Sequence, residues 1–322
     1  MADNYTVRKI TEEELDLLIP LTEDAFNKAV SLDYFKWKFS SNPSGKVVGL
    51  MAFSEQNEPA AFYGLMPQIF VVDGEEKVFY QACNGMTHSN HTRKGLFKKL
   101  HVVGDRFLQD EAKTIGISYT GPITLKSKLF FGWKKTAQFR NFFFPRQLMF
   151  APSKKGLEQV VEMEELNPIE DLLQQSNGSA RIHAKKSAEI YRWRISNPEK
   201  TYKVIAYKDE TGQYHGFVTY LSEKDKILVF DFYFNTKQAG KTLLAYLKRI
   251  VKAEKLKGIV SQAQDDSYYA QALLSYGFLV NKTNKGPLKG TKPFTILVPN
   301  SDQEVMINSE YWCLNAFEYD AE

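Results

Sequence analysis

An internal repeat limits this chain to a small number of architectures. Residues 34–43 read YFKWKFSSNP, and residues 190–198 read IYRWRISNP, which is one residue shorter. Each copy is followed by an apolar stretch, a polar turn and a second apolar stretch, over 47–66 in the first half and 202–221 in the second. A repeated unit of this kind indicates duplication, so the sequence predicts two copies of one fold.

Two pairs of glycines support this interpretation. Gly240 lies 145 positions after Gly95, and Gly277 lies 145 positions after Gly132. The first pair is expected at the start of a helix. The second pair is followed by an aromatic residue and is expected where a short helix ends. A shared offset at two separate landmarks is harder to attribute to chance than a single match.

Strands and helices are mixed in the first half, which indicates an α/β (α+β) fold. Strands are expected over 7–10, 47–53, 60–72, 77–87, 115–119 and within 138–150. Helices are expected over 11–29, 95–112 and 125–131. Thr11 with Glu14 reads as a capping box, and Asp73-Gly74 reads as a hairpin turn.

The length of 322 residues favours two domains over one. We expect an N-terminal domain over 1–150 and a degenerate C-terminal domain over 151–322, with a polar linker over about 151–186. Hydrophobic residues make up 43% of the chain, which is enough to build a substantial core.

Charge and cysteine content exclude several classes of protein. Lys and Arg number 42 and Asp and Glu 38, so the net charge of +4 is too mild to predict a nucleic-acid partner. Cys83 and Cys313 have no metal-ligand spacing, and neither a disulfide framework nor a metal site is expected. The N-terminus lacks an apolar signal region and no run of about 18 apolar residues occurs, so we expect a cytoplasmic protein with no membrane contact.

The most informative local feature is a strand end, a basic turn and an amphipathic helix over 86–100. A helix that begins at such a turn presents free N–H groups and the positive end of its dipole to an anion. The sequence therefore predicts a phosphate site here. Its candidate residues are Met86, Thr87, His88, Thr92, Arg93, Lys94, Gly95, Leu96, Phe97 and Lys98.

These residues resemble the GCN5-related N-acetyltransferase superfamily. Thr87-His88 with Lys94-Gly95-Leu96-Phe97 is similar to a bacterial motif that reads roughly T-H-P-x-x-R-G-K-G-I-F. The later segment 129–134 (LFFGWK) is similar to that family's short helix followed by Gly and an aromatic residue. The resemblance covers nearly all of the first repeat and, more weakly, the second, as in tandem members of the family.

The resemblance implies a fold and a reaction. Each lobe would hold a mixed, mostly antiparallel twisted sheet flanked by helices. Acetyl-CoA would be the co-substrate, with its phosphates on the basic turn and its amide-rich arm paired with the free strand edge at Met86, Thr87 and His88. The acetyl group would pass directly to the amine of a small molecule, with an amino sugar or nucleotide-linked amino sugar preferred, and a backbone N–H would stabilise the oxyanion.

The chain departs from the family pattern at three positions. Thr92 replaces a Gln or Arg, Phe97 replaces a Gly or Ala, and Lys128 stands where many members place a Tyr as general acid. Two residues are candidates for proton transfer. His88 titrates near neutral pH, with a structural hydrogen bond as the alternative role, and Tyr119 ends the strand that faces the same cleft.

Two alternative functions stay open, and one apparent nucleotide-binding motif is incomplete. The chain is alternatively a non-catalytic acyl-CoA- or partner-binding module, or an aminoacyl-tRNA-dependent amino-acid transferase of the Fem type. Residues 238–242 (QAGKT) imitate a P-loop, but Asn235 stands where the first Gly is needed. The expected partner is a small-molecule amine acceptor, and a homodimer is also compatible with the sequence.

Overall fold

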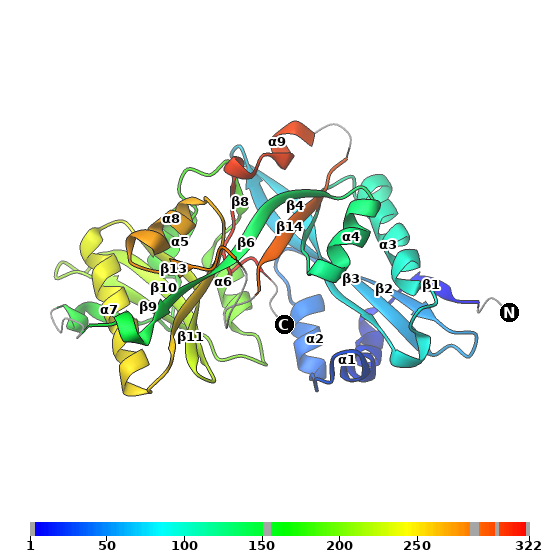
Figure 1. Ribbon diagram of the computed structural model, residues 1–322, viewed down its shortest axis with the longest axis horizontal. Helices are drawn as coiled ribbons and strands as arrows, with labels where there is room; N and C mark the ends of the chain where they lie inside the picture. The colour runs from blue at the N-terminus through cyan, green and yellow to red at the C-terminus, as the bar shows by residue number, and fades with distance from the viewer. Residues whose placement is uncertain (1–3, 151–155, 284–289, 300–302, 320–322) are drawn as a thin grey trace.

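The computed structural model describes residues 4–150, 156–283, 290–299 and 303–319. Two lobes lie side by side, the N-terminal one drawn in blue to green and the C-terminal one mainly in green to yellow (Figure 1). The strands of the first half are β1 (Thr6–Lys9), β2 (Val48–Phe53), β3 (Pro59–Val72), β4 (Glu75–Thr87), β5 (Gly116–Tyr119) and β6 (Lys134–Pro145). The remaining strands are β7 (Val160–Glu162), β8 (Ile182–Ala184), β9 (Lys203–Lys208), β10 (Tyr214–Glu223), β11 (Lys226–Phe234), β12 (Gly258–Gln264), β13 (Leu279–Val280), β14 (Lys292–Leu297) and β15 (Trp312–Cys313).

All fifteen of these strands join one mixed sheet. Its main path runs β1-β2-β3-β4-β5-β14-β6-β12-β11-β10-β9-β7. Pairing is parallel between β4 and β5, between β11 and β12, and between β8 and β15, and it is antiparallel in the other pairs. The predicted fold class, a mostly antiparallel sheet in each of two lobes, is therefore confirmed.

The two lobes share strands at their junction. β14 comes from the end of the chain but lies between β5 and β6 of the first lobe. β6 in turn pairs with β14 over its first half and with β12 and β13 over its second half. Figure 1 shows β6 and β14 crossing the middle of the molecule. The division of the chain at residue 150 stays a prediction, while the sheet itself is continuous across the junction.

Helices cover both faces of the sheet. They are α1 (Leu18–Phe26), α2 (Leu32–Phe39), α3 (Leu96–Arg106), α4 (Pro122–Phe130), α5 (Glu170–Gln175), α6 (Ala188–Ile195), α7 (Lys237–Ala253), α8 (Tyr268–Ser275) and α9 (Gln303–Ile307). Short 3-10 segments span Glu12–Leu17, Ser89–His91, Arg146–Leu148, Leu157–Gln159, Asn167–Ile169 and Ser309–Tyr311, and α3 continues as a π-helix over Phe107–Glu111. The capping box of Thr11 and Glu14 is present.

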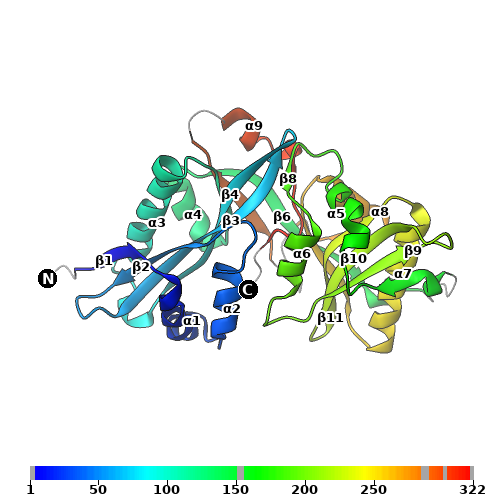
Figure 2. The same cartoon turned by 180° about the vertical axis from the view of Figure 1, so that it is seen from behind.

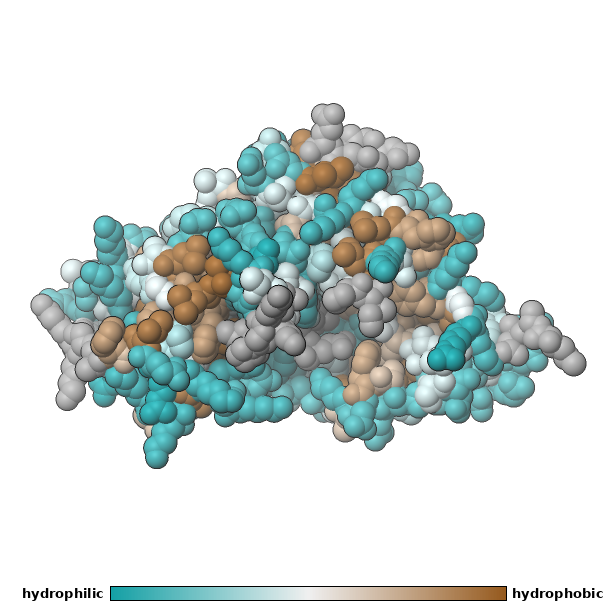
Figure 3. All heavy atoms as spheres, viewed as in Figure 1, coloured by the Kyte–Doolittle hydropathy of each residue, from teal (hydrophilic) through white to brown (hydrophobic). Residues whose placement is uncertain are grey.

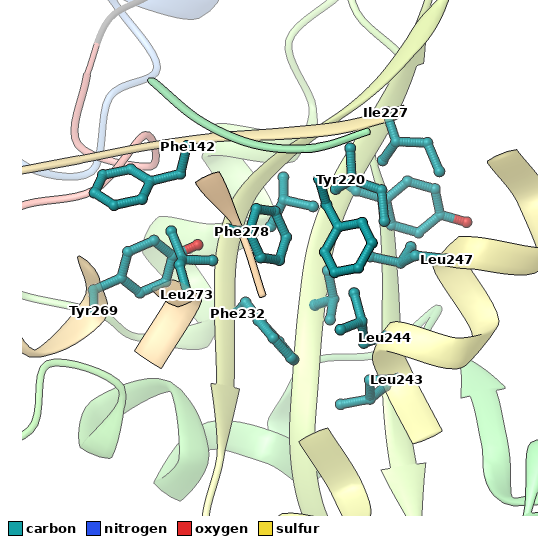
Figure 4. Packing of buried hydrophobic residues seen from close by; sticks show 14 of the residues in the cluster. Phe142, Tyr220, Ile227, Phe232, Leu243, Leu244, Leu247, Tyr269, Leu273 and Phe278 are labelled. Atoms are coloured by element: carbon teal, nitrogen blue, oxygen red, sulfur yellow. The ribbon is translucent and has the colours of Figure 1, made fainter. Parts of the chain in front are cut away.

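Alternation along the strands decides which helix each face receives. In β2, Met51 and Phe53 pack with α1 and α2, whereas Leu50 and Ala52 pack with α3 on the opposite face. In the C-terminal lobe, leucines of α7 meet aromatic side chains of β10 and β11, and Leu273 of α8 joins the same cluster (Figure 4). In the N-terminal lobe the sheet is thus buried on both faces.

The repeated tryptophans meet at the junction between the lobes. The rings of Trp37 and Trp193 stack with centroids 5.0 Å apart. Each indole N–H donates to the other residue's backbone carbonyl, at 2.6 Å from Trp37 and 2.9 Å from Trp193. Figure 2 shows α2 and α6, which carry them, facing one another. The two copies of the repeated segment therefore pack against each other through these tryptophans.

One glycine pair of the repeat is confirmed and the other is wrong. Gly132 and Gly277 both follow a short helix with positive φ, 87° and 89°, where a residue other than Gly is strained. Gly95 is the N-cap of α3, but Gly240 lies inside α7, because Thr236 starts that helix earlier. A Cβ at Gly240 would lie 2.3 Å from the hydroxyl of Tyr276, so this glycine serves packing.

The segment predicted as a polar linker carries structure. Within its described part, 156–186, lie β7, α5 and β8, and Leu166, Ile169 and Leu173 are buried. β8 pairs with β3 of the first lobe, which ties this segment to the sheet. In the part of the chain that the structure describes, no helix has the length and apolar character needed to cross a bilayer.

Candidate functional site

The central strands of the first lobe separate and open a cavity. β4 and β5 pair only at Tyr80 with Gly116 and at Gln81 with Ile117, and beyond these positions the two strands diverge. A cavity of about 250 Å³ lies at the divergence. It is lined by Phe26, Tyr63, Gln81, Ala82, Cys83, Asn84, Gly85, Phe97, His101, Ser118, Tyr119, Thr124, Lys128 and Tyr319. An extended ligand therefore has access to the edge of β4.

A bulge bends β4 at the cavity wall. Phe62 pairs with Met86 and Gly64 pairs with Cys83, so β4 holds one more residue than β3 between these pairs. Asn84 in the bulge has a φ of 47°, a region uncommon for residues other than Gly. The buried Nζ of Lys38 donates to its side-chain oxygen. Strained residues of this kind cluster at functional sites, where their surroundings hold them in place.

The basic turn has an unusual backbone and an open helix start. Arg93 and Gly95 both have positive φ, 62° and 74°, so the chain reverses sharply before α3. Gly95 is the N-cap and has no side chain to offer, so none of the first-turn N–H groups of α3 is capped by it. By contrast, Ser31, Ser187, Thr236 and Ser267 cap α2, α6, α7 and α8 through their side chains. α3 is thus the helix among these five that is open to an external anion.

Aromatic rings line the wall between α3 and α4. The His101 ring lies 4.2 Å from the Phe97 ring and 4.3 Å from the Tyr63 ring between centroids, and it stacks on Phe131 at 5.6 Å. Burial lowers the pKa of His101 to about 2, and Lys128 adds to the effect, so the imidazole is neutral. Its Nδ1 is buried with no hydrogen-bond partner among the described residues.

A buried cation completes this wall. Lys128 of α4 is 3% exposed, and its Nζ donates to the hydroxyl of Tyr63 at 2.9 Å and lies 3.4 Å from the ring centre of Trp133. The indole N–H of Trp133 is 3.3 Å from both carboxylate oxygens of Asp105. Burial lowers the pKa of Lys128 to about 7, partly opposed by Asp105. Burial therefore disfavours the charged form of this side chain.

The structure brings only some of the predicted residues to the cavity. Phe97 and Tyr119 line it, and the hydroxyl of Tyr119 is buried with no hydrogen-bond partner among the described residues. Burial raises the pKa of Tyr119 well above its usual value, so the phenol stays protonated. His88 lies away from the lining. Its Nδ1 accepts from the N–H of Asn90 at 3.2 Å and lies 3.8 Å from Asp24.

The other predicted residues form the approach to the cavity. The side chains of Met86 and Leu96 are buried, and the hydroxyl of Thr92 donates to the carbonyl of Ser89. Arg93, Lys94, Gly95 and Lys98 are exposed, and Thr87 ends β4. The Phe97 ring lies beside Gly85 of β4. A Cβ placed on Gly85 would be 3.9 Å from this ring. The first turn of α3 therefore stands beside the open edge of β4.

Sequence reasoning missed most of the residues that line the cavity, Tyr63, His101 and Tyr319 among them, and it also missed Asp105 beside them. Tyr63, His101 and Asp105 come from β3 and α3, and Tyr319 comes from the end of the chain. A signal existed for two of them, since His101 and Asp105 lie four residues apart on the predicted amphipathic helix and so share one face. Nothing local marked Tyr63 or Tyr319, because their role depends on the packing of distant segments.

A hydrophobic patch adjoins the approach. Phe130 of α4 is 78% exposed and Leu129 is 46% exposed, and Lys98 of α3 lies 6.0 Å from the ring centre of Phe130. Figure 3 shows this patch over α4, and a second one over α8 and β13. An exposed ring beside a lysine suits a ligand that is both aromatic and anionic.

Solved structures share this architecture, although no protein-family model and no curated relative matches the chain. A GCN5-related N-acetyltransferase from Anabaena variabilis is 12% identical, with a TM-score of 0.69 over 95% of this chain and 75% of that one. A probable N-acyltransferase of unknown function from Enterococcus faecalis is 10% identical, with a TM-score of 0.68 over 92% of this chain and 73% of that one.

A third similar structure is an enzyme that was solved with an acyl-CoA bound. The Saccharomyces cerevisiae N-myristoyltransferase with bound myristoyl-CoA is 10% identical, with a TM-score of 0.59 over 92% of this chain and 79% of that one. At this level of identity the likenesses show the fold alone. The chain therefore has the fold of the GCN5-related N-acetyltransferases, as the resemblance in its sequence implied.

Proposed function

We propose that this protein is an acyl-CoA-dependent N-acyltransferase that passes an acetyl group from acetyl-CoA to the amine of a small molecule. One observation carries the proposal. The open, basic start of α3 stands directly beside the cavity at which β4 and β5 diverge. An anion-binding helix start and an unpaired strand edge, joined at one cavity, match the two chemically different ends of this co-substrate.

The phosphate end suits the turn. The pyrophosphate of acetyl-CoA would accept hydrogen bonds from the first-turn N–H groups of α3, which Gly95 leaves uncapped. The exposed side chains of Arg93, Lys94 and Lys98 would neutralise its charge and that of the 3′-phosphate. Thr92 contributes no charge, but the backbone N–H groups do not depend on it.

The pantetheine end suits the strand. Its amide groups would pair with the edge of β4 that β5 leaves beyond Gln81, in the manner of an added strand. This edge leads into the cavity along Ala82 and Gly85. The bulge at Asn84 turns backbone groups of β4 away from the β3 ladder, and we assign the oxyanion-stabilising N–H to this bend.

The cavity favours a short acyl group. Gln81, Ser118 and Tyr119 are polar residues of its lining, and its volume is about 250 Å³. Burying a long alkyl chain against the Tyr119 hydroxyl, which has no hydrogen-bond partner among the described residues, would keep water from that hydroxyl, which is unfavourable. A two-carbon acyl group avoids that cost.

The transfer itself needs no covalent enzyme intermediate. The amine nitrogen attacks the thioester carbonyl, the C–N bond forms, and the C–S bond breaks as the oxyanion collapses. The acceptor would approach from the junction of the lobes, where Tyr319 from the C-terminal segment meets Tyr119 with ring centroids 5.0 Å apart. An amino sugar or nucleotide-linked amino sugar is the preferred acceptor, and the second lobe would complete its cleft.

Calorimetry with acetyl-CoA tests the binding half of this proposal. Gly95→Asp places a carboxylate where the pyrophosphate would bind, and Gly95→Asn is its matched control, because both residues tolerate positive φ and only one is charged. We expect Gly95→Asp to weaken the affinity for acetyl-CoA by roughly tenfold or more and Gly95→Asn to change it little.

Thiol release in the presence of amino sugars and other small amines tests the transfer half. Release that depends on both acetyl-CoA and an amine supports the proposal. Binding without release from any amine would indicate a non-catalytic acyl-CoA module. No binding of acetyl-CoA by the native protein would contradict the proposal altogether.

A further inference from the structure

The residue after each repeated tryptophan is a buried cation, Lys38 in α2 and Arg194 in α6. Lys38 is 0% exposed and Arg194 is 5% exposed. The residue before each tryptophan is also basic, but Lys36 and Arg192 are exposed. Burying a cation is unfavourable unless its partners compensate, and an apolar residue would serve the packing of these helices. The partners of the two buried cations therefore indicate what the charges do.

Lys38 contacts the bend of β4 at the cavity. Its Nζ donates to the side-chain oxygen of Asn84, and it donates to the hydroxyl of Tyr34 at 3.4 Å. Asn84 lines the cavity and has a φ of 47°, which is uncommon for residues other than Gly. A hydrogen bond from a cation is about twice as strong as one between neutral groups, so Lys38 offsets part of the cost of this conformation. The direction of the backbone N–H groups at the bend depends on that conformation.

Arg194 contacts a segment on the other side of the cavity. Its guanidinium donates to the backbone carbonyl of Tyr319, which lines the cavity. The Tyr319 ring packs against Tyr119 of β5, with ring centroids 5.0 Å apart. Asn84 lies on β4 and Tyr119 on β5, so the two buried cations support the two strands that diverge at the cavity. Because Arg194 binds the backbone of Tyr319, it fixes the point from which the ring of that residue enters the wall.

The stacked tryptophans fix the two cations relative to each other. Trp37 and Trp193 stack and exchange hydrogen bonds from indole N–H to backbone carbonyl. Lys38 and Arg194 are the next residues of the same two helices, which face one another in Figure 2. The contact between α2 and α6 therefore sets the separation of the two cations, and with it the placement of the segments that they hold.

We propose that Lys38 and Arg194 are positioning residues of the acyl transfer, which hold the β4 and β5 sides of the cavity through Asn84 and Tyr319. Lys38 keeps the bend of β4 in the conformation that aims a backbone N–H at the oxyanion. Arg194 keeps Tyr319 at the wall along which the amine approaches. Both cations lie outside the lining of the cavity, so each acts through the residue that it holds. This inference rests on the proposed function.

Matched variants separate this role from packing. Lys38→Met and Arg194→Met remove each cation but keep an unbranched side chain, and Lys38→Arg and Arg194→Lys exchange the two cations that the repeat itself contains. Lys36→Met and Arg192→Met are the controls, because these cations are exposed on the same helices. Three quantities are measured: the affinity for acetyl-CoA by calorimetry, thiol release from acetyl-CoA with a panel of small amines led by glucosamine, and backbone amide exchange by mass spectrometry.

We expect Lys38→Met to lower kcat by about 100-fold while the affinity for acetyl-CoA stays the same, because the oxyanion donor is no longer aligned. Arg194→Met should instead raise the KM for the amine by about tenfold or more and leave the affinity for acetyl-CoA unchanged. Amide exchange should become faster at 82–87 in the first variant and at 313–319 in the second. Lys38→Arg and Arg194→Lys should restore most of the lost activity, and both controls should behave as the native protein.

A double variant tests whether Lys38 acts through Asn84. Asn84→Gly tolerates the positive φ and removes the side-chain oxygen that Lys38 binds. Lys38→Met should therefore lower kcat little when it is added to Asn84→Gly, although it lowers kcat strongly in the native protein. Equal losses of kcat in the two backgrounds would show that Lys38 works by another route and would contradict its assignment.

Three other results would overturn the inference while leaving the proposed function in place. They are native kinetics in Lys38→Met and Arg194→Met, a loss of acetyl-CoA affinity that accounts for the lost activity, and equal losses in Lys36→Met and Arg192→Met. A native protein that releases no thiol with any amine would contradict the proposed transfer. Faster exchange confined to 82–87 and 313–319 would then still support the positioning of these segments, and unchanged exchange would overturn it.

Discussion

Several cations are buried in this molecule, and each meets different partners. Lys38 donates to the side chain of Asn84, Arg194 donates to the carbonyl of Tyr319, and Lys186 lies between two carboxylates. Lys128 meets a phenol and the face of an indole. A buried charge is unfavourable unless its partners compensate, so these partners decide how each group responds to pH.

Lys186 is a single buried cation that faces two carboxylates, those of Asp231 and Glu318. Its Nζ lies 2.7 Å from Asp231 and 3.6 Å from Glu318, and all three side chains are buried. Burial raises the pKa of Glu318 to about 7, Lys186 opposes the shift, and Asp231 adds to it. Between the ordinary glutamate pKa of about 4.3 and pH 7 the folded protein therefore binds more protons than the unfolded chain.

Glu318→Gln should consequently change how stability depends on pH. The free energy of unfolding of the native protein should fall as pH rises from about 4.5 to above 7, by on the order of 3 kcal/mol from this group. The variant should lack this loss and be the more stable protein at pH 8. Denaturant unfolding at pH 5 and pH 8 measures the difference, with Glu310→Gln, an exposed residue, as control. Equal pH dependence in the native protein and Glu318→Gln would contradict this account.

At the scale of single residues, the sequence indicated which positions are unusual but not which residues contact them. It marked Lys128 as a departure within a short-helix motif, and it marked the turn at Gly95 as an anion site. It did not indicate Tyr63 or Asp105 as neighbours of Lys128, because those contacts join three elements that are distant in the chain. It also offered His88 as a base, whereas the structure places that imidazole on a local backbone N–H.

At the scale of elements, the two lobes differ in how α3 and α7 begin. α3 begins at Gly95 with no side chain over its first-turn N–H groups, while α7 begins at Thr236, whose hydroxyl accepts from the N–H of Ala239 at 3.2 Å. The segment that imitates a P-loop, 238–242, is therefore ordinary helix behind a satisfied cap. This difference explains why we place the co-substrate in the first lobe.

Removing the cap of α7 should affect stability and not binding. Thr236→Ala removes the acceptor for the Ala239 N–H and should lower the free energy of unfolding by about 1 kcal/mol. Thr236→Ser keeps the hydroxyl and is the matched control. Acetyl-CoA affinity should be the same in all three proteins. If Thr236→Ala lost acetyl-CoA binding while remaining folded, the assignment of the co-substrate to α3 would be wrong.

Element boundaries were largely predictable because they rest on local signals. Turn residues such as Asp73-Gly74 and the capping box at Thr11 fix where strands and helices begin or end. The match of Gly240 to Gly95 was wrong for the same reason. A capping threonine three residues before Ala239 starts α7 early, and local cap chemistry outweighed the spacing of the repeat.

At the scale of the whole molecule, the strand order across the junction of the lobes could not be predicted from the sequence pattern. The repeat predicted two lobes, but not that β14 of the second half would lie between β5 and β6 of the first. Such pairing depends on contacts between segments more than 150 residues apart, and no local propensity specifies it. The stacked Trp37 and Trp193 are the one part of the junction that the sequence marked.

The exchange of strands also gives the second lobe a role in the site. β14 lies beside β5, whose Tyr119 lines the cavity, and Tyr119 packs against Phe294 of β14 and against Tyr319. A substitution in the C-terminal half can therefore alter the cavity through this packing, even if the C-terminal lobe binds no ligand itself. The two lobes are best regarded as one catalytic unit in the proposed function.

A crystal structure grown with CoA tests the central claim most directly. We predict the phosphates at the start of α3, beside Arg93 and Gly95, and the thiol in the cavity between β4 and β5. CoA bound instead in the groove between α7 and α8, which Lys237, Lys241 and Lys248 line, would contradict the placement. A cavity at β4 and β5 that stays without CoA at saturating concentration would contradict the account as a whole.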